Sequence, residues 1–414
     1  MNEIEDRLEE LRRSGLYRKL RMVSGPQGPR VLLNGKPVLL LCSNNYLGLA
    51  DHPRVRQSAA DAAMRWGVGA GASRLVSGNM TVHRRLEEML ADFKGTEGCV
   101  LFGSGYLANT GVVSSLAREG DLVFSDELNH ASIVDGCRLS RAETFVYRHK
   151  DMDHLEWGLA QAKGRGALIV TDGVFSMDGD VAPLEDIVEL AGAYDTRVMV
   201  DDAHGTGCMG PDGRGSVAAA GLEQEVDVIV GTLGKALGSY GAFACCDRTM
   251  AKYLVNTARS LIFSTALPPP AVAGAMAALE LLNEEPRRVE RLARNSRVMR
   301  EQLAENGVVT GDDQTQIVPV IIGAAADAMS VCEELLAQGV FAQAIRPPTV
   351  AEGSSRLRIA VMSSHTKSEL TDAARLIGRL AKPFAAQHQV ERARVLASGE
   401  PDRSRIYDGL SEAA

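Results

Sequence analysis

The sequence lacks the features that mark several common classes of protein. No apolar run approaches the ~18 residues that a membrane-spanning helix needs. The first residues, MNEIEDRLEELRRSG, are charged where a secretory signal would be apolar. The 45 basic and 53 acidic residues give a net charge of -8, so no basic surface for nucleic acid is indicated. We therefore expect a cytoplasmic protein that binds neither membrane nor nucleic acid.

The seven cysteines do not form any familiar framework. Their number is odd and they contain no C-x-x-C pair; they are Cys42, Cys99, Cys137, Cys208, Cys245, Cys246 and Cys332. A disulfide scaffold usually has an even set of cysteines, and a structural zinc site usually has closely spaced pairs. We therefore predict no disulfide framework, no metal site and a reducing compartment.

Glycine, by contrast, is concentrated around one lysine. The stretch GTLGKALGSYG (Gly231 to Gly241) surrounds Lys235 with glycines directly after the apolar run VDVIV. A phosphate-binding P-loop would need glycine and Ser or Thr where this chain has Ile229 and Ala236. A lysine that must meet a flat ligand at close range does benefit from neighbours without Cβ atoms. The stretch therefore indicates a ligand site of another kind.

The order of apolar runs predicts an α/β protein. From about Asp51, helical segments alternate with short runs, which are CVLFGSG, DLVFSD, TFVYRH, ALIVTDGV, RVMVDDAHG, VDVIVGTLGK and GAFACC. Runs that are apolar throughout are typical of parallel strands covered on both faces. We expect an N-terminal helix and hairpin in residues 1–50 and a large domain in 51–285. A smaller α+β domain over 286–388 and a tail over 389–414 should follow.

Polar residues follow these runs, where an open α/β sheet binds its ligands. They are Gly105, Tyr106, His130, Ser176, Asp201, His204, Thr232 and Lys235. Each has a plain structural explanation by itself, as a helix cap, a turn former or a satisfied polar side chain. Together they match the needs of pyridoxal phosphate: a lysine for the Schiff base, a carboxylate for the ring nitrogen, a flat side chain to stack, a donor for the phenolic oxygen and helix-start amides for the phosphate.

Seven motifs carry a family resemblance that covers roughly residues 10–385. They are LCSNNYLGLADHP, GAGASRLVSGN, HASIVDG, DGVFSMDGD, VDDAHGTG, GTLGKALG and IFSTALPP. With them the chain resembles the α-oxoamine synthases, which are fold-type I pyridoxal-phosphate enzymes. These enzymes condense an amino acid with an acyl thioester and release carbon dioxide. The resemblance implies a PLP-dependent transferase whose large domain has a mainly parallel seven-stranded sheet, with a smaller C-terminal α+β domain.

The resemblance also implies a role for each cofactor residue. Lys235 matches the Schiff-base lysine, Asp201 the partner of the pyridine nitrogen and His130 the ring-stacking histidine. His204 and Ser176 match the partners of the phenolic oxygen. The phosphate contacts match Gly105, Tyr106 and Thr232. Ser264 and Thr265 match a stretch that the family contributes across a homodimer interface, so shared active sites are expected.

Substrate contacts follow from the same resemblance. Arg358 matches the arginine that binds the substrate carboxylate, and Arg18 and Thr349 match acyl contacts, with Arg21 as a competitor for the role of Arg18. His130 is also a candidate catalytic and substrate contact, as a donor to the thioester carbonyl, although ring stacking accounts for it equally well. The segment IRPPTVAEGSSRLRIAV (residues 345–361) most resembles the biotin-pathway branch, which joins L-alanine to pimeloyl-CoA or a pimeloyl-carrier protein. Relatives that use glycine with acetyl-CoA, or serine with a long acyl thioester, remain alternatives.

Two further alternatives and one departure bear on this assignment. A non-catalytic relative would be expected to lose Lys235 or Asp201, and both are present. A nucleotide-binding loop could be argued from GVGAGASRLVSG (residues 67–78), but that stretch follows a helix signal where a strand is required. Asp172 stands where the family usually has glutamate, which implies a shorter or water-bridged hydrogen bond.

Overall fold

The computed structural model describes residues 3–162, 164–311 and 313–398. Contacts divide the chain into two compact units, which we call the large unit (residues 44–293) and the small unit (the described parts of residues 1–43 and 294–414). The N-terminal strands belong to the small unit because β3 pairs with β12, some 300 positions later. Of the tail expected over 389–414, the part as far as Ser398 is helical, and the remainder lies outside the described residues.

A seven-stranded sheet organises the large unit. Its order is β4-β10-β9-β8-β7-β5-β6. The strands are β4 (Gly98–Phe102), β5 (Leu122–Asp126), β6 (Glu143–Tyr147), β7 (Ala167–Asp172), β8 (Arg197–Asp201), β9 (Val228–Thr232) and β10 (Ala242–Cys246). Only β10 runs antiparallel to its two neighbours in this sheet. The predicted mainly parallel sheet of an α/β fold is confirmed.

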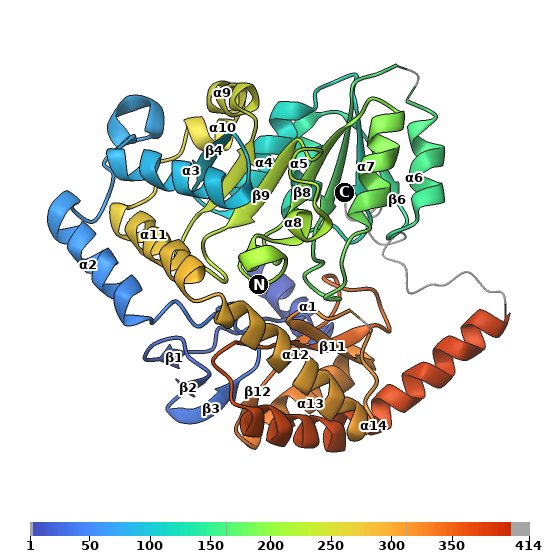
Figure 1. Cartoon of the computed structure of the whole chain (residues 1–414). Helices are drawn as coiled ribbons and strands as arrows, with labels where there is room; N and C mark the ends of the chain where they lie inside the picture. Colours follow the sequence, from blue (N-terminus) through green and yellow to red (C-terminus); the bar gives the residue numbers. More distant parts are fainter. Residues whose placement is uncertain (1–2, 163, 312, 399–414) are drawn as a thin grey trace. The chain divides into compact units, whose positions relative to one another are not determined.

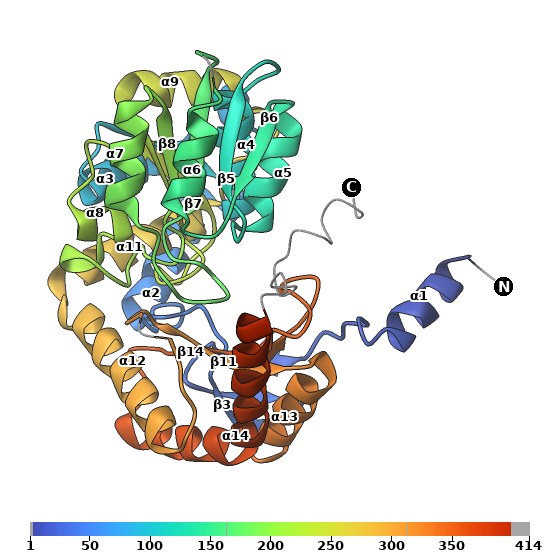
Figure 2. The ribbon, with the colours of Figure 1, turned by 90° about the vertical axis from the view of Figure 1, so that its right-hand side faces the viewer.

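Helices cover both faces of this sheet (Figures 1 and 2). The helices of the large unit are α2 (Pro53–Trp66), α3 (Thr81–Lys94), α4 (Gly105–Leu116), α5 (Ala131–Ser140), α6 (Met152–Leu159), α7 (Leu184–Ala193), α8 (Ser216–Ala220), α9 (Arg248–Thr257), α10 (Arg259–Ile262) and α11 (Pro269–Glu284), with short turns η1 (Arg74–Gly78) and η2 (Pro211–Gly213). Successive crossovers turn right-handed, so α4 and α5 share one face and α6, α7 and α8 the other. Apolar side chains of α4 and α5 form a core with the strands beneath them.

The small unit combines two smaller sheets with helices. Its strands are β1 (Val23–Ser24), β2 (Arg30–Leu33), β3 (Lys36–Leu40), β11 (Ile317–Gly323), β12 (Val340–Phe341), β13 (Gln343–Ile345) and β14 (Ser355–Ala360), and its helices are α1 (Glu3–Arg13), α13 (Ala325–Ala337) and α14 (Lys367–Ser398). Helix α12 (Arg287–Glu305) runs from the large unit into the small one. The predicted hairpin is confirmed: β2 and β3 are joined by Asn34 and Gly35, both with positive φ as a two-residue turn requires.

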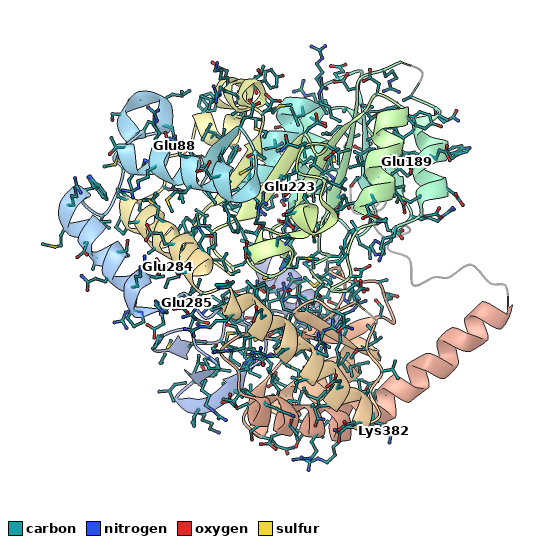
Figure 3. All side chains as sticks on the ribbon, viewed as in Figure 1. Glu88, Glu189, Glu223, Glu284, Glu285 and Lys382 are labelled. Carbon is teal, nitrogen blue, oxygen red and sulfur yellow. The ribbon has the colours of Figure 1, made fainter. Side chains whose placement is uncertain are left out.

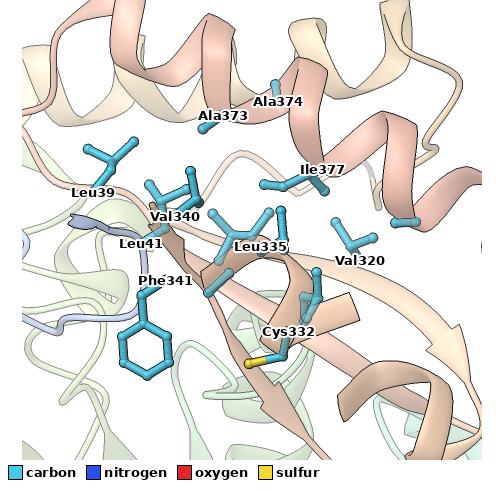
Figure 4. Close-up of a cluster of buried hydrophobic side chains, with 14 of the residues drawn as sticks. Leu39, Leu41, Val320, Cys332, Leu335, Val340, Phe341, Ala373, Ala374 and Ile377 are labelled. Carbon is cyan, nitrogen blue, oxygen red and sulfur yellow. The ribbon is translucent and has the colours of Figure 1, made fainter. Parts of the chain in front are cut away.

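The core of the small unit explains why its distant segments fold together. Leu39 and Leu41 from the first hairpin lie among Leu335 of α13, Val340 of β12 and Ile377 of α14 (Figure 4). The Leu41 backbone N–H donates to the Phe341 carbonyl and the Leu41 carbonyl accepts from the Ala360 N–H, which closes the same junction. In the part of the chain that the structure describes, no helix combines the length and the apolar character that crossing a bilayer requires.

A buried ion pair supports the sheet edge from one side. The Lys94 ammonium, at the end of α3, donates to Asp202 Oδ2 at 2.6 Å, Thr206 Oγ1 at 2.8 Å and the Arg214 carbonyl at 2.6 Å. The other Asp202 oxygen accepts from the backbone and hydroxyl of Ser216. Both charged side chains are almost wholly excluded from solvent, at 1% and 0% exposure. Loss of either charge would leave the other buried and unpaired.

Substituting Lys94→Met should therefore destabilise the protein by roughly 3 kcal/mol, the usual cost of breaking a buried ion pair from one side. Thermal unfolding followed by circular dichroism measures this as a lower melting temperature. Arg84→Met is the matched control, because Arg84 pairs with Glu88 on the outer surface of α3 (Figure 3) and exposed pairs contribute about 0–1 kcal/mol. Equal melting temperatures for the two variants would contradict a stabilising role of the buried pair.

A second charged cluster holds the loop after β7. The His149 imidazole lies between two carboxylates, with Nδ1 at 2.9 Å from Asp126 and Nε2 at 2.7 Å from Asp180. Its ring also meets the Phe175 ring edge-on, with centroids 4.5 Å apart. Burial by itself would lower the pKa of His149, but the hydrogen bonds to Asp126 and Asp180 raise it to about 10. His149 is therefore a cation at neutral pH.

This pKa predicts how stability changes with pH. Because it is raised above the value of about 6.5 in an unfolded chain, the stabilisation is fully present below pH 6.5 and is lost as the pH rises towards 10. We expect His149→Gln to lower the melting temperature most near pH 6.5 and least near pH 10. Asp180→Asn should show the same trend, since it removes the other member of the pair. A deficit for His149→Gln that does not change over this range would exclude the cation.

Candidate active site

The carboxyl ends of three adjacent strands carry polar side chains in register. Asp172 of β7 is opposite Asp201 of β8, and Asp201 is opposite Val230 of β9. Side chains alternate along a strand. The side chains of Asp172, Asp201 and Thr232 therefore lie on the same face of the sheet as the core residues two positions before each of them. That face is the one covered by α4. Strand register thus places these residues on one face of the sheet, and that they form one ligand site stays a prediction.

The glycines around Lys235 allow its loop to approach two other segments. A Cβ on Gly231 would lie 2.2 Å from the Phe243 ring on β10. A Cβ on Gly238, whose φ is +61°, would lie 2.4 Å from the backbone nitrogen of Ala50. The lysine loop therefore packs backbone against backbone on the SNNYLGLA segment. Glycine at these positions therefore allows the close approaches and the positive φ.

Lys235 is joined to a chain of buried polar groups. Its half-buried ammonium lies 2.8 Å from His204 Nε2, and His204 Nδ1 lies 2.8 Å from the Tyr46 hydroxyl. Tyr46 is fully buried and donates to Asn44 Oδ1 at 3.0 Å. Because the Tyr46 proton goes to Asn44, His204 donates from Nδ1 to Tyr46, and the lone pair on Nε2 faces the lysine amine. The chain thus orients Lys235 towards the strand ends.

Two carboxyl groups lie opposite each other on neighbouring strands, Asp172 on β7 and Asp201 on β8. Asp201 accepts from the Ala203 backbone at 2.9 Å and from Asn109 Nδ2 at 2.5 Å. Burial, and then the neighbouring Asp201 charge, raise the pKa of Asp172 well above its ordinary value. Two adjacent buried carboxyl groups do not readily both ionise. Asp172 is therefore the carboxyl group that holds a proton more readily, whereas Asp201 accepts from two N–H donors.

The start of α4 offers amides for an anion. Ser104 caps the helix by accepting from the Leu107 backbone, so the N–H groups of Gly105 and Tyr106 find no acceptor among the described residues. The space beside Gly105 is open, since a Cβ there would meet nothing within 4 Å. Asn109, four residues on, lies about 6 Å along the axis. Helix α4 thus offers amides for an anion in its first turn and, one turn later, holds Asp201 through Asn109.

The remaining predicted cofactor residues take different positions. His130 caps the start of α5, its ring accepting from the Ser132 backbone. Burial lowers its pKa, while the charges of Asp201 and Lys235 act on it in opposite directions. Ser176 is buried in the loop after β7. Thr232 donates to the Gly241 carbonyl at 3.0 Å, which stabilises the lysine loop.

Thr265 and the predicted substrate residues lie elsewhere. Thr265 is exposed, in a backbone bridge to Ser73. Arg18, Thr349 and Arg358 belong to the small unit, where Arg358 is buried on β14 and the other two are exposed.

The segments that carry Arg18 and Thr349 are tied together inside the small unit. Arg346 donates to the Tyr17 carbonyl at 2.9 Å, next to Arg18, and the Thr349 backbone donates to the Arg346 carbonyl at 3.2 Å. Arg21, the competitor of Arg18, pairs with Glu333 and lies 5.4 Å from the Phe341 ring. These contacts give Arg21 a structural role that Arg18 lacks in the described contacts.

Sequence reasoning missed several polar residues of the site. Tyr46 lies in a stretch that also suits an ordinary turn, and Asn109 lies inside a helix without a motif of its own. Ser132 lies in the HASIVDG motif, but the resemblance assigns a role there only to His130. The available signal was polarity at positions where the helix is otherwise buried, as for Asn109 in GYLANTGVV. Buried polar groups are normally hydrogen-bonded, so such a residue points to a partner in the fold.

These groups fit pyridoxal phosphate. The cofactor needs an amine for its aldehyde, an anion for its ring nitrogen and donors for its phosphate. Lys235 could supply the amine, Asp201 the anion, and the first amides of α4 the donors. No group of three or more histidine, cysteine or acidic side chains in the described part of the chain could hold a metal ion.

Comparison with known proteins agrees with this chemistry. Residues 36–377 match the family model described as aminotransferase class I and II. The 8-amino-7-oxononanoate synthase of Citrifermentans bemidjiense is 54% identical over 92% of this chain and 99% of its own. That of Geobacter sulfurreducens is 51% identical over 92% and 98%.

Solved structures extend the comparison. A serine palmitoyltransferase from S. paucimobilis with bound PLP and myriocin is 31% identical, with a TM-score of 0.87 over 92% of this chain and 98% of that one. The 8-amino-7-oxononanoate synthase of Francisella tularensis is 25% identical, with a TM-score of 0.73 over 86% and 99%. The chain therefore belongs to the aminotransferase class I and II family, as a pyridoxal-phosphate enzyme of the α-oxoamine synthase type.

Proposed function

We propose that this enzyme condenses L-alanine with a pimeloyl thioester, with loss of carbon dioxide, to give 8-amino-7-oxononanoate for biotin biosynthesis. The observation that carries the reaction type is the half-buried Lys235 amine, 2.8 Å from His204, in the loop next to the strand that ends in the buried Asp201. The substrates are supported by relatives 46–54% identical that bear the name 8-amino-7-oxononanoate synthase.

The chain's own residues divide the work of binding and proton transfer. Pyridoxal phosphate, when bound, supplies a ring that accepts the negative charge developed at the amino-acid Cα. Lys235 Nζ would hold the cofactor through its aldehyde and would act as the base for the Cα proton of the bound amino acid. His204 orients that amine through Nε2. Asp201 keeps a proton on the ring nitrogen, because its two N–H donors hold the carboxylate ionised.

Substrate recognition rests on residues of the small unit. We propose that Arg358 binds the carboxylate of L-alanine, since a guanidinium can hold a carboxylate with two parallel hydrogen bonds. Arg18 and Thr349 contact the acyl substrate. The Arg346–Tyr17 hydrogen bond supports a common role for them, because it ties their two segments together.

Serine palmitoyltransferase is the second candidate function, favoured by the higher TM-scores of those structures. Enzymes with different substrates can share one fold, so backbone similarity distinguishes poorly between the candidate substrates. Sequence identity distinguishes the two candidate functions better. It is 54% with the 8-amino-7-oxononanoate synthase and 31% with the serine palmitoyltransferase. A glycine and acetyl-CoA enzyme is the remaining alternative.

We also propose that two copies associate through the surface around η1 and α10, with Thr265 at the interface. Val76 of η1 is 80% exposed and Phe263, directly after α10, is 71% exposed. Helix α10 contacts both η1 and α4, so these apolar side chains gather on adjoining elements. Clustered exposed apolar residues are typical of a surface that another protein covers.

Product identification tests the reaction. Incubation with pimeloyl-CoA should give a mass-spectrometric signal for 8-amino-7-oxononanoate with L-alanine, and at least tenfold less condensation product with glycine or serine. A pimeloyl-carrier protein assayed in parallel identifies the better acyl donor. Equal or greater turnover with serine and palmitoyl-CoA would favour the second candidate.

Lys235→Ala is the control for this assay. It should retain cofactor by non-covalent contacts and yield no product. Borohydride reduction of the wild-type enzyme, followed by peptide mapping, should place a pyridoxyl adduct on Lys235. Full turnover by the variant would exclude the lysine as the reacting amine.

Sedimentation analysis tests the association. The wild-type protein should sediment at twice the 44.3 kDa of one chain. Val76→Glu combined with Phe263→Glu should shift it towards the monomer, because burying two new carboxylates opposes association. Val309→Glu is the control, since Val309 is also exposed but lies in the small unit. A wild-type monomer, or a dimer unchanged by the double substitution, would refute the proposed surface.

A further inference from the structure

A hydrogen-bond chain connects the charged carboxylate of the site to the histidine at the start of α5. Asn109 Nδ2 lies 2.5 Å from Asp201 Oδ2 and 2.9 Å from Ser132 Oγ. Ser132 Oγ lies 2.7 Å from His130 Nδ1. Asp201, Asn109 and Ser132 are all buried, so solvent does not readily replace these partners.

The direction of the chain is fixed by what each group can donate. An ionised Asp201 only accepts, so Asn109 must present its NH2 group to it. The same NH2 group faces Ser132 Oγ and donates its second hydrogen there. The Ser132 hydroxyl hydrogen must then go elsewhere, and the acceptor that the structure places within reach is His130 Nδ1.

A rotated amide would reverse this order, but electrostatics oppose the rotation. Turning the Asn109 side chain over would put its oxygen 2.5 Å from the Asp201 carboxylate. In the observed orientation, Asn109 Oδ1 is buried with no hydrogen-bond partner among the described residues. The fold thus tolerates an unsatisfied acceptor in order to present two N–H donors.

Two donors converge on the same ring nitrogen. The Ser132 backbone N–H also points at His130 Nδ1, at 3.3 Å. A proton on Nδ1 would meet both donors, and the helix start that His130 caps also disfavours a positive charge. The other groups that act on His130 are Asp201, Lys235, and Asp172, which accepts from the His130 backbone at 3.4 Å.

We propose that Asn109 and Ser132 are positioning residues that hold His130 as the neutral tautomer with its proton on Nε2. His130 then presents an N–H group to the ligand and acts as a hydrogen-bond donor, and it is not the base of the reaction. This role rests on the proposed function only for the identity of the ligand. The tautomer itself is a property of the protein.

The experiment reads the tautomer directly by nitrogen NMR. Protein labelled with ¹⁵N-histidine is measured with bound pyridoxal phosphate and again without cofactor, and His130→Gln identifies the His130 signals. In both wild-type samples Nδ1 should show the shift of an unprotonated ring nitrogen, and Nε2 that of a protonated one. A wild-type His130 with its proton on Nδ1 would overturn the proposal.

Variants test the two positioning residues. Asn109→Leu and Ser132→Ala each remove a donor from the chain. In each, the single tautomer should give way to a mixture, and the pH at which the His130 signals titrate should rise. Ser140→Ala is the matched control, because it removes another buried hydroxyl from α5, which donates to the Cys137 carbonyl at 2.6 Å and accepts from the Ala142 backbone at 3.1 Å. It should leave the His130 signals unchanged.

The outcomes separate this inference from the proposed function. If both positioning variants fold but keep the wild-type tautomer and titration, the chain does not hold His130 and the inference fails. If the tautomer is as expected but no 8-amino-7-oxononanoate forms, only the substrate assignment fails. If one variant does not fold, the other and the wild-type spectrum still decide.

Discussion

The site depends on one negative charge held inside the protein. Asp201 keeps that charge because two N–H donors face it and because its neighbour, Asp172, takes the proton that the pair must share. Strand register brings the two carboxyl groups together. A one-residue slip of β8 would turn Asp201 to the opposite face, away from Asn109. Cofactor chemistry thus depends on sheet pairing.

Adjacent acidic residues in the VDDAHG motif serve different ends. Asp201 faces α4 and the site, whereas Asp202 bonds Lys94 at the end of α3. Alternation along the chain sends neighbouring side chains to opposite faces, so one motif supplies both a cofactor partner and a structural ion pair. At the end of β5 and in the loop after it, two polar residues also make separate structural contacts. Asp126 bonds His149, and the nearby Asn129 donates to the Val170 carbonyl.

The sequence predicts much of the fold because local signals and the global arrangement agree. Apolar runs mark all seven strands of the large sheet, and the polar residues at their ends mark Asp201, His204 and Lys235. It does not predict that β3 pairs with β12, since no local pattern specifies a partner 300 residues away. Nor does it predict Tyr46 behind His204, or Asn109 beside Asp201. Those contacts arise only when separate segments pack, and a lone polar residue in a helix does not name its partner.

The residues proposed for chemistry and for substrate choice belong to different parts of the chain. Those proposed to hold charge and move protons, Lys235, His204 and Asp201, lie in the large unit on strands and loops of the buried sheet. The residues proposed to recognise substrates, Arg18, Thr349 and Arg358, lie in the small unit. Enzymes named serine palmitoyltransferase and 8-amino-7-oxononanoate synthase share one backbone with this chain. One fold can serve different substrates, so side-chain identity is the better guide to the substrates.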